Sequence, residues 1–125
     1  MKRRFVILIL WTLILLGLLL SPIAETQIPS PGGFKHFDKV AHFGLFFVTG
    51  LVGVFSTRFL SQFGTRMLFG IVFGLFLAVS TEFAQSFIPL RNMSLYDFFA
   101  DVAGLGVALV LCVFLHRQPK FRAFF

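Results

Sequence analysis

The feature that most constrains this chain is a series of four long apolar runs separated by short polar breaks. Each run has about 20 residues, the length that an α-helix needs to cross the hydrocarbon core of a bilayer. Only 13% of the 125 residues are charged, and 20 residues are Phe. This is too little polar surface to cover a water-soluble core. The sequence therefore predicts an all-α fold, an integral membrane bundle of four transmembrane helices that forms a single domain over residues 1–125.

Proline, glycine and polar residues indicate where the spans end. Residues 25–37 are rich in Pro and Gly and cannot continue a helix. Pro89 stops the third span, and Ser94 followed by Asp97 has the form of a capping box at the start of the fourth. The expected spans are residues 5–23, 39–57, 67–87 and 95–115.

The first span has a second interpretation as a cleavable signal peptide, because a basic start precedes its apolar core. The apolar stretch of residues 5–20 is slightly long for a signal peptide, and Pro22 stands where the cleavage site needs a small residue. We therefore expect a retained helix.

Lys and Arg are divided unevenly between the two sides of the predicted bundle. The side with both termini carries eight: Lys2, Arg3, Arg4, Arg58, Arg66, Arg117, Lys120 and Arg122. The other side carries three: Lys35, Lys39 and Arg91. Because cytoplasmic loops are enriched in Lys and Arg, we expect both termini in the cytoplasm. These cations stand at the ends of apolar runs and leave no basic face for nucleic acid, so the expected partner is the lipid bilayer.

The acidic residues all fall on the outer side or just inside the membrane from it: Glu25, Asp38, Glu82, Asp97 and Asp101. Small residues form a stripe on each of the last three spans and lead to this layer; Gly70 and Gly74 precede Glu82 in this way. Small residues let membrane helices approach closely, so these spans should bring the polar side chains into one outward-facing pocket. Glu82 lies at a depth where an unpaired carboxylate costs several kcal/mol, which requires a proton, a partner or water.

The polar residues form four motifs: DK-x-x-H at Asp38–His42, E-x-x-Q at Glu82–Gln85, P-x-R at Pro89–Arg91, and S-x-x-D at Ser94–Asp97 with Gly104 beyond it. In order and spacing, over roughly residues 36–108, they resemble the VanZ-like family. This is a group of small polytopic bacterial membrane proteins named for a member linked to teicoplanin resistance. The resemblance implies a multi-pass protein of the bacterial cytoplasmic membrane and a link to antibiotic resistance. Asp101 departs from the family, which usually has Asn there.

The placement of these residues suggests a pocket that binds or acts on a lipid-linked or phosphorylated component of the cell envelope, such as a cell-wall precursor. Glu82 and His42 are the candidate catalytic acid and base, and Arg91 would bind phosphate. The other candidate binding residues are Asp38, Lys39, Gln85, Ser94, Asp97 and Asp101. The alternative is a non-enzymatic structural or accessory protein whose polar cluster locks the helices together.

Other functional classes receive less support from the sequence. A divalent ion could use His42 with Asp97, Asp101 or Glu82, but no tight ligand spacing supports it, and no metal site is predicted. No G-x-S-x-G, P-loop or H-E-x-x-H motif is present. Ion transport is not expected, because no ionisable residue crosses the cytoplasmic half. Cofactor, substrate and oligomeric state do not follow from the sequence.

Overall fold

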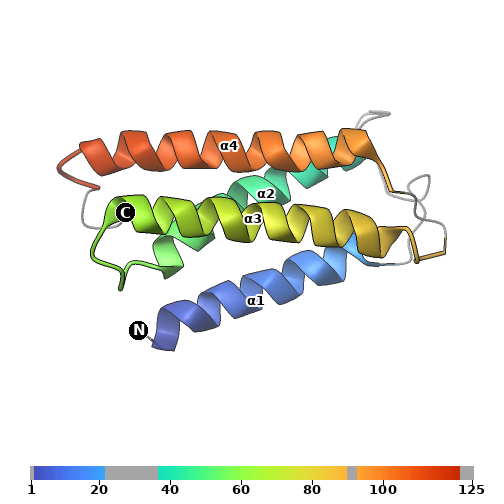
Figure 1. Ribbon diagram of the computed structural model, residues 1–125, viewed down its shortest axis with the longest axis horizontal. Coiled ribbons are helices and arrows are strands. Elements are labelled where there is room, and N and C mark those ends of the chain that lie inside the picture. The colour runs from blue at the N-terminus through green and yellow to red at the C-terminus, as the bar shows by residue number, and fades with distance from the viewer. Residues whose placement is uncertain (1, 22–36, 90–92, 122–125) are drawn as a thin grey trace.

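The computed structural model is an all-α bundle, and it describes residues 2–21, 37–89 and 93–121. The described helices are α1 (Lys2–Leu19), α2 (Phe37–Ser56), α3 (Phe63–Gln85) and α4 (Leu95–Arg117) (Figure 1). The predicted all-α class is therefore confirmed. The Pro/Gly-rich stretch before Phe37 and the predicted phosphate-binding Arg91 lie outside the described residues.

Three of these helices, α2, α3 and α4, are long and apolar enough to cross a membrane. With 20, 23 and 23 residues, they are roughly 30–35 Å long, which matches the hydrocarbon thickness of a bilayer. The 18 residues of α1 include three cations at its start, and these shorten its apolar part. The length and composition of α2, α3 and α4 place the chain among membrane proteins.

Consecutive helices run in opposite directions, so the bundle has two distinct ends (Figure 1). At one end α1 and α3 begin and α2 and α4 end; we call it the cation end. Its described basic residues are Lys2, Arg3, Arg4, Arg58, Arg66, Arg117 and Lys120. At the opposite end, which we call the acid end, lie the four described acidic residues: Asp38, Glu82, Asp97 and Asp101.

The helix α2 contacts the other three helices and packs most extensively on α4. Glycine makes this close approach possible, because a Cβ atom at Gly104 would overlap the backbone carbonyl of Phe43. A Cβ at Gly50 would likewise lie 2.7 Å from the Cβ of Ala108. The small-residue stripes therefore lie where the backbones of α2 and α4 meet.

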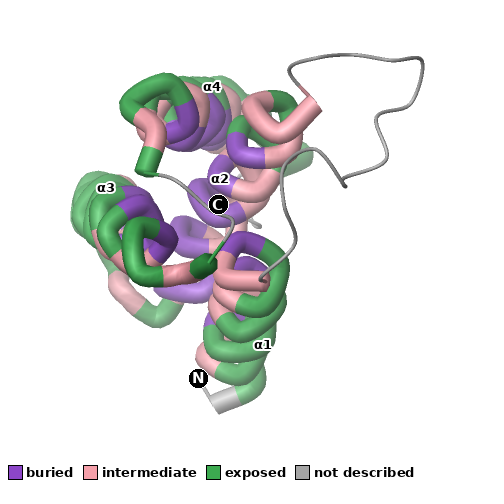
Figure 2. The backbone as a smooth tube through the Cα atoms, turned by 90° about the vertical axis from the view of Figure 1, so that its right-hand side faces the viewer, coloured by how far each residue is buried: buried purple, intermediate pink, exposed green. Residues whose placement is uncertain are grey.

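The buried residues of the four helices face one another, as Figure 2 shows from the acid end, and many of the exposed residues are large and apolar. Two buried apolar clusters fill the interior. One contains Leu15, Leu19, Phe46, Leu77 and Ala78, and the other contains Val54, Leu105, Leu109 and Cys112. Large apolar side chains such as Phe76 and Val110 remain exposed on the outside, where a bilayer would cover them.

Candidate functional site

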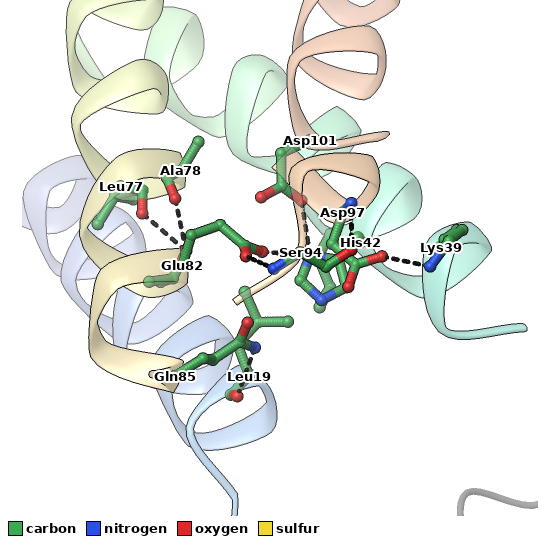
Figure 3. Close-up of polar contacts among 12 residues, drawn as sticks. Leu19, Lys39, His42, Leu77, Ala78, Glu82, Gln85, Ser94, Asp97 and Asp101 are labelled. Carbon is green, nitrogen blue, oxygen red and sulfur yellow. Dashed lines mark hydrogen bonds and ion pairs between the residues drawn. The ribbon is translucent and has the colours of Figure 1, made fainter. Parts of the chain in front are cut away.

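Seven polar residues from three helices meet at the acid end (Figure 3), and we call this group the polar cluster. The start of α2 contributes Asp38, Lys39 and His42, the last turns of α3 contribute Glu82, and the start of α4 and its cap contribute Ser94, Asp97 and Asp101. The spacing of four residues places Asp97 and Asp101 on one face of α4, and it places Asp38 and His42 on one face of α2. Because α2 and α4 run in the same direction and pack on each other, these two faces meet at the start of both helices.

The centre of the cluster is His42, which lies between two carboxylates from different helices. Its Nδ1 atom is 2.9 Å from Oδ1 of Asp101 and 3.8 Å from Oε1 of Glu82. All three residues are buried, with exposed fractions of 1%, 0% and 4% for His42, Asp101 and Glu82. The two residues proposed from the sequence as catalytic candidates are therefore neighbours, with Asp101 as a third member of the group.

A second ion pair lies nearer the membrane surface. The Nζ atom of Lys39 donates to Oδ1 of Asp97 at 2.8 Å and joins α2 to α4. The Asp97 side chain is 2% exposed, whereas that of Lys39 is 34% exposed. Lys39 thus reaches from the interface to neutralise a buried carboxylate, as long cationic side chains do in membranes.

The N-terminus of α4 is capped by two residues from different helices. Ser94 is the N-cap, and its Oγ atom accepts the backbone N–H of Asp97 at 3.4 Å. In a capping box the third residue of the helix would accept the N–H of the cap in return. Here Oε2 of Glu82 from α3 accepts the Ser94 N–H at 2.9 Å, while Asp97 is bonded to Lys39.

Three side-chain atoms of the cluster are buried without a hydrogen-bond partner among the described residues. They are Nε2 of His42, Oε1 of Glu82 and Oδ2 of Asp101. Unpaired polar atoms are costly in an apolar interior and rare in folded proteins. Three such atoms from adjacent residues indicate a site that a further chemical group would complete.

The remaining site residues predicted from the sequence lie in different places. Asp38 lies at the edge of the cluster, where its carboxylate is within 4.8 Å of ligand atoms of His42 and Asp97. Gln85 is buried but bonds elsewhere, because its Nε2 atom donates to the backbone carbonyl of Leu19 at 2.9 Å. It thereby ties the end of α1 to α3. Arg91 lies outside the described residues.

A cavity of about 500 Å³ between α1 and α2 extends to the polar cluster. Its wall is almost entirely apolar but includes Asp38 and His42 at the acid end. Trp11 also lines it, and the indole N–H of Trp11 donates to Oγ1 of Thr49 at 2.9 Å. This role of Trp11 was not predicted from the sequence. The sequence feature that could have indicated it is that Trp11 is the single Trp of the chain and stands inside a largely aliphatic run.

The charge of the described cluster is acidic. Four carboxylates face one lysine and one histidine, and Lys39 is already bonded to Asp97. Such a group favours hydrogen-bond donors or a cation over a bare anion. The fold and site thus define a class: an all-α membrane protein with a buried acid–histidine cluster at one end of its bundle.

Comparison with known proteins adds one relative. The sequence is similar to Uncharacterized protein C11E3.10 of Schizosaccharomyces pombe, with 37% identity over 83 residues. The match covers 65% of this chain and 49% of the yeast protein, so the chain spans about half the length of that relative. No family model matches the chain, and no solved structure matches it.

These findings overturn the resemblance to the VanZ-like family. No family model supports it, and the similar protein comes from a eukaryote. The prediction of a bacterial cytoplasmic-membrane protein linked to teicoplanin resistance loses its basis with it. The physical reason is that the four motifs are short. Polar residues at helix ends, spaced one turn apart, are what an antiparallel bundle with a buried ionisable cluster requires.

Proposed function

We propose that the acid end binds the polar part of a membrane lipid or lipid-linked molecule whose chain lies in the cavity between α1 and α2. The observation that carries this proposal is the continuity of the apolar cavity with the polar cluster through Asp38 and His42. An apolar wall accepts a hydrocarbon chain, and a few convergent polar groups fix the orientation of a ligand. The carboxylates would accept hydrogen bonds from hydroxyl or amine groups of the bound molecule.

In this proposal Glu82 and His42 are the groups able to move a proton. A carboxylate and an imidazole 3.8 Å apart form the kind of pair that serves as general acid and base when a ligand lies within reach. Asp101, at 2.9 Å from the imidazole, would hold the ring in one orientation. Binding of the lipid head to the cluster therefore comes first, and proton transfer to or from it is the chemistry that the residues allow.

Blocking the cavity tests the proposal. Gly44 lines the cavity, and a Cβ atom added there meets nothing within 4 Å, so Gly44→Phe fills space without forcing the helices apart. Gly17→Phe is the matched control, because Gly17 also has open space around its Cβ position but lies on the exposed face of α1. The probe is a long-chain alcohol with a diazirine in its chain, added to the purified protein in lipid nanodiscs.

We expect light-induced adducts to concentrate on residues of the cavity wall, such as Leu45 and Val48, in the parent chain and in Gly17→Phe. Gly44→Phe should lose these adducts. Peptide mapping by mass spectrometry gives the distribution. Adducts spread evenly over the lipid-facing side chains of all the helices, and unchanged by Gly44→Phe, would sink the proposal.

We further propose that α1 is a fourth span and that the cation end faces the cytoplasm. The support is the distribution of charge, since the described chain has seven cations at the cation end and only Lys39 at the acid end. Thr65→Cys and Ser86→Cys, made separately with the buried Cys112 changed to Ala, place one exposed thiol at each end. In intact cells a membrane-impermeant maleimide should label Ser86→Cys and spare Thr65→Cys; the reverse pattern contradicts this orientation.

A second candidate function is a structural one, in which the cluster only locks the helices together. The interhelical contacts favour it, since Lys39–Asp97 and His42–Asp101 join α2 to α4 and His42–Glu82 joins α2 to α3. Glu82→Gln separates the two candidates. Gln still accepts the Ser94 N–H but removes a buried charge, so the binding proposal expects unchanged or higher thermal stability in detergent when parent and variant are both compared in the presence of a chelator. The structural lock predicts a loss of about 3–5 kcal/mol, the cost of breaking a buried ion pair.

A further inference from the structure

The three central residues of the cluster have the geometry of a ligand set. One candidate ligand atom from each of His42, Glu82 and Asp101 lies within 4.8 Å of the other two. From Nδ1 of His42, the nearest carboxylate oxygens are 2.9 Å and 3.8 Å away. Two ligand atoms bound to one ion at about 2.0–2.2 Å lie roughly 3.0–3.5 Å apart. The two separations from Nδ1 lie close to that value, and the two carboxylate oxygens lie within 4.8 Å of each other, so the three side chains would close around one ion by moving toward a common centre.

The unpaired atoms provide a second, independent observation. Glu82 gives one oxygen to the Ser94 N–H and Asp101 gives one to His42. The other oxygen of each carboxylate has no hydrogen-bond partner among the described residues, and the two residues are only 4% and 0% exposed. A cation between them would satisfy both oxygens. Figure 3 shows the two carboxylates approaching the His42 ring from different helices.

Charge balance supports the same conclusion. Glu82 and Asp101 would carry two negative charges inside a membrane span, where unbalanced charge is expensive. Lys39 is bonded to Asp97 at 2.8 Å and neutralises that carboxylate instead. One divalent ion with a neutral imidazole would make the central group electrically neutral.

We propose that His42, Glu82 and Asp101 bind one divalent metal ion of the kind that accepts mixed imidazole and carboxylate ligands, such as Zn²⁺ or Mn²⁺. Three protein ligands leave a coordination position for water or for an atom of a bound molecule. The ion would also allow the acid end to hold an anionic group, which the carboxylates alone would repel. This inference goes beyond lipid binding and does not depend on it; with the ion bound, His42 and Glu82 act as ligands in place of the acid–base role considered above.

A neighbouring group, Asp38, His42 and Asp97, also has ligand atoms within 4.8 Å of one another. We assign the ion to the central group because Asp97 is already paired with Lys39 and Asp38 is only half-buried. Asp38→Asn is therefore the matched control. It removes a carboxylate of the same cluster without touching the proposed ligands.

The experiment uses the full chain, purified in detergent without chelators, and measures metal content by inductively coupled plasma mass spectrometry. We expect about one ion per chain in the parent protein and in Asp38→Asn, and loss of the ion in Glu82→Gln and Asp101→Asn. Chelator-stripped parent protein titrated with Co²⁺ should develop a visible ligand-field absorption band and a rise in Tm. These parent measurements keep the test decisive if a variant fails to fold.

Absence of metal in the parent, together with no Co²⁺ band and no rise in Tm, would overturn the proposal. Loss of the ion from Asp38→Asn would also overturn it, because it would place the ion in the neighbouring group. Neither readout involves the cavity. Failure of the photolabelling experiment would therefore leave the metal site standing, and absence of metal would leave lipid binding standing.

Discussion

The two ends of the bundle satisfy their polar groups in different ways. At the cation end, Thr57, the residue that follows α2, donates to the Gly53 carbonyl in the last turn of α2 at 2.9 Å, and Nε of Arg66 donates to the Leu60 carbonyl at 2.7 Å. At the acid end, the bonds cross between helices, as from His42 to Asp101, which are 59 residues apart in the chain. Local bonds form wherever a helix forms, whereas cross-helix bonds need the whole bundle.

The two ends also differ in how deeply their charged groups are buried. The cation end carries charges in half-exposed or exposed positions, where they cost little stability: Arg3, Arg4, Arg58, Arg66, Arg117 and Lys120. The acid end buries three carboxylates, Glu82, Asp97 and Asp101, and this burial lowers stability unless ligands or partners compensate for it. Expensive and incompletely paired groups concentrated at one end point to a functional site there.

The largest effect is expected from crowding the backbone contact beside the polar cluster. In Gly104→Ala the new methyl group would overlap the Phe43 carbonyl, so α2 and α4 must separate. We expect a loss of about 3 kcal/mol or more in the free energy of unfolding, at the upper end of overpacking costs. Thermal unfolding in detergent measures it.

Gly106→Ala is the control for this substitution, because a Cβ added there on the same helix meets nothing within 4 Å. It should be neutral or stabilising by about 0.5–1 kcal/mol. At the cation end, Gly53→Ala should cost less than Gly104→Ala, since its Cβ would lie 3.3 Å from the Cα of Gly70. Equal losses of unfolding free energy for Gly104→Ala and Gly53→Ala would contradict the conclusion that the helix contact is closer at Gly104.

An intermediate effect is expected from removing one cation at each end. Lys39→Met leaves the buried Asp97 carboxylate without its partner, and we expect a loss of about 2–4 kcal/mol. Arg66→Met removes hydrogen bonds to backbone carbonyls at a partly exposed position and should cost about 1 kcal/mol or less. Urea or SDS unfolding of both variants gives the comparison. A larger loss of unfolding free energy for Arg66→Met than for Lys39→Met would contradict the conclusion that the costly buried charges lie at the acid end.

The smallest effect is expected from removing a single uncharged donor at each end. Gln85→Met breaks the bond from α3 to the Leu19 carbonyl of α1 and should cost about 1–2 kcal/mol. Thr57→Val removes a bond within one helix, whose carbonyl acceptor keeps its helical partner, and should cost roughly 0.5 kcal/mol. Hydrogen exchange should show faster opening of α1 only in Gln85→Met. Faster exchange of α1 in both variants would contradict the local character of the Thr57 bond.

Much of the fold followed from the sequence because its signals are local. The apolar runs predicted helices, and Ser94 with Asp97 predicted the start of α4, whose N-cap is Ser94. The small-residue stripes indicated which faces meet, as the contact of Gly104 with Phe43 illustrates. The family resemblance was wrong. Its motifs are short, and polar residues spaced one turn apart at helix ends are a general requirement of bundles that bury an ionisable cluster.

The sequence by itself determined the helices, the charge difference between the two ends and the gathering of acidic residues in one layer. Only the tertiary structure decided which polar atoms pair. Glu82, and not Asp97, completes the cap of α4; Lys39 pairs with Asp97; and Gln85 bonds to α1. The physical reason is that the two kinds of interaction span different distances along the chain. Helix formation and capping depend on residues three or four apart, whereas pairing across helices depends on rotation and depth, which close packing of α2, α3 and α4 fixes together.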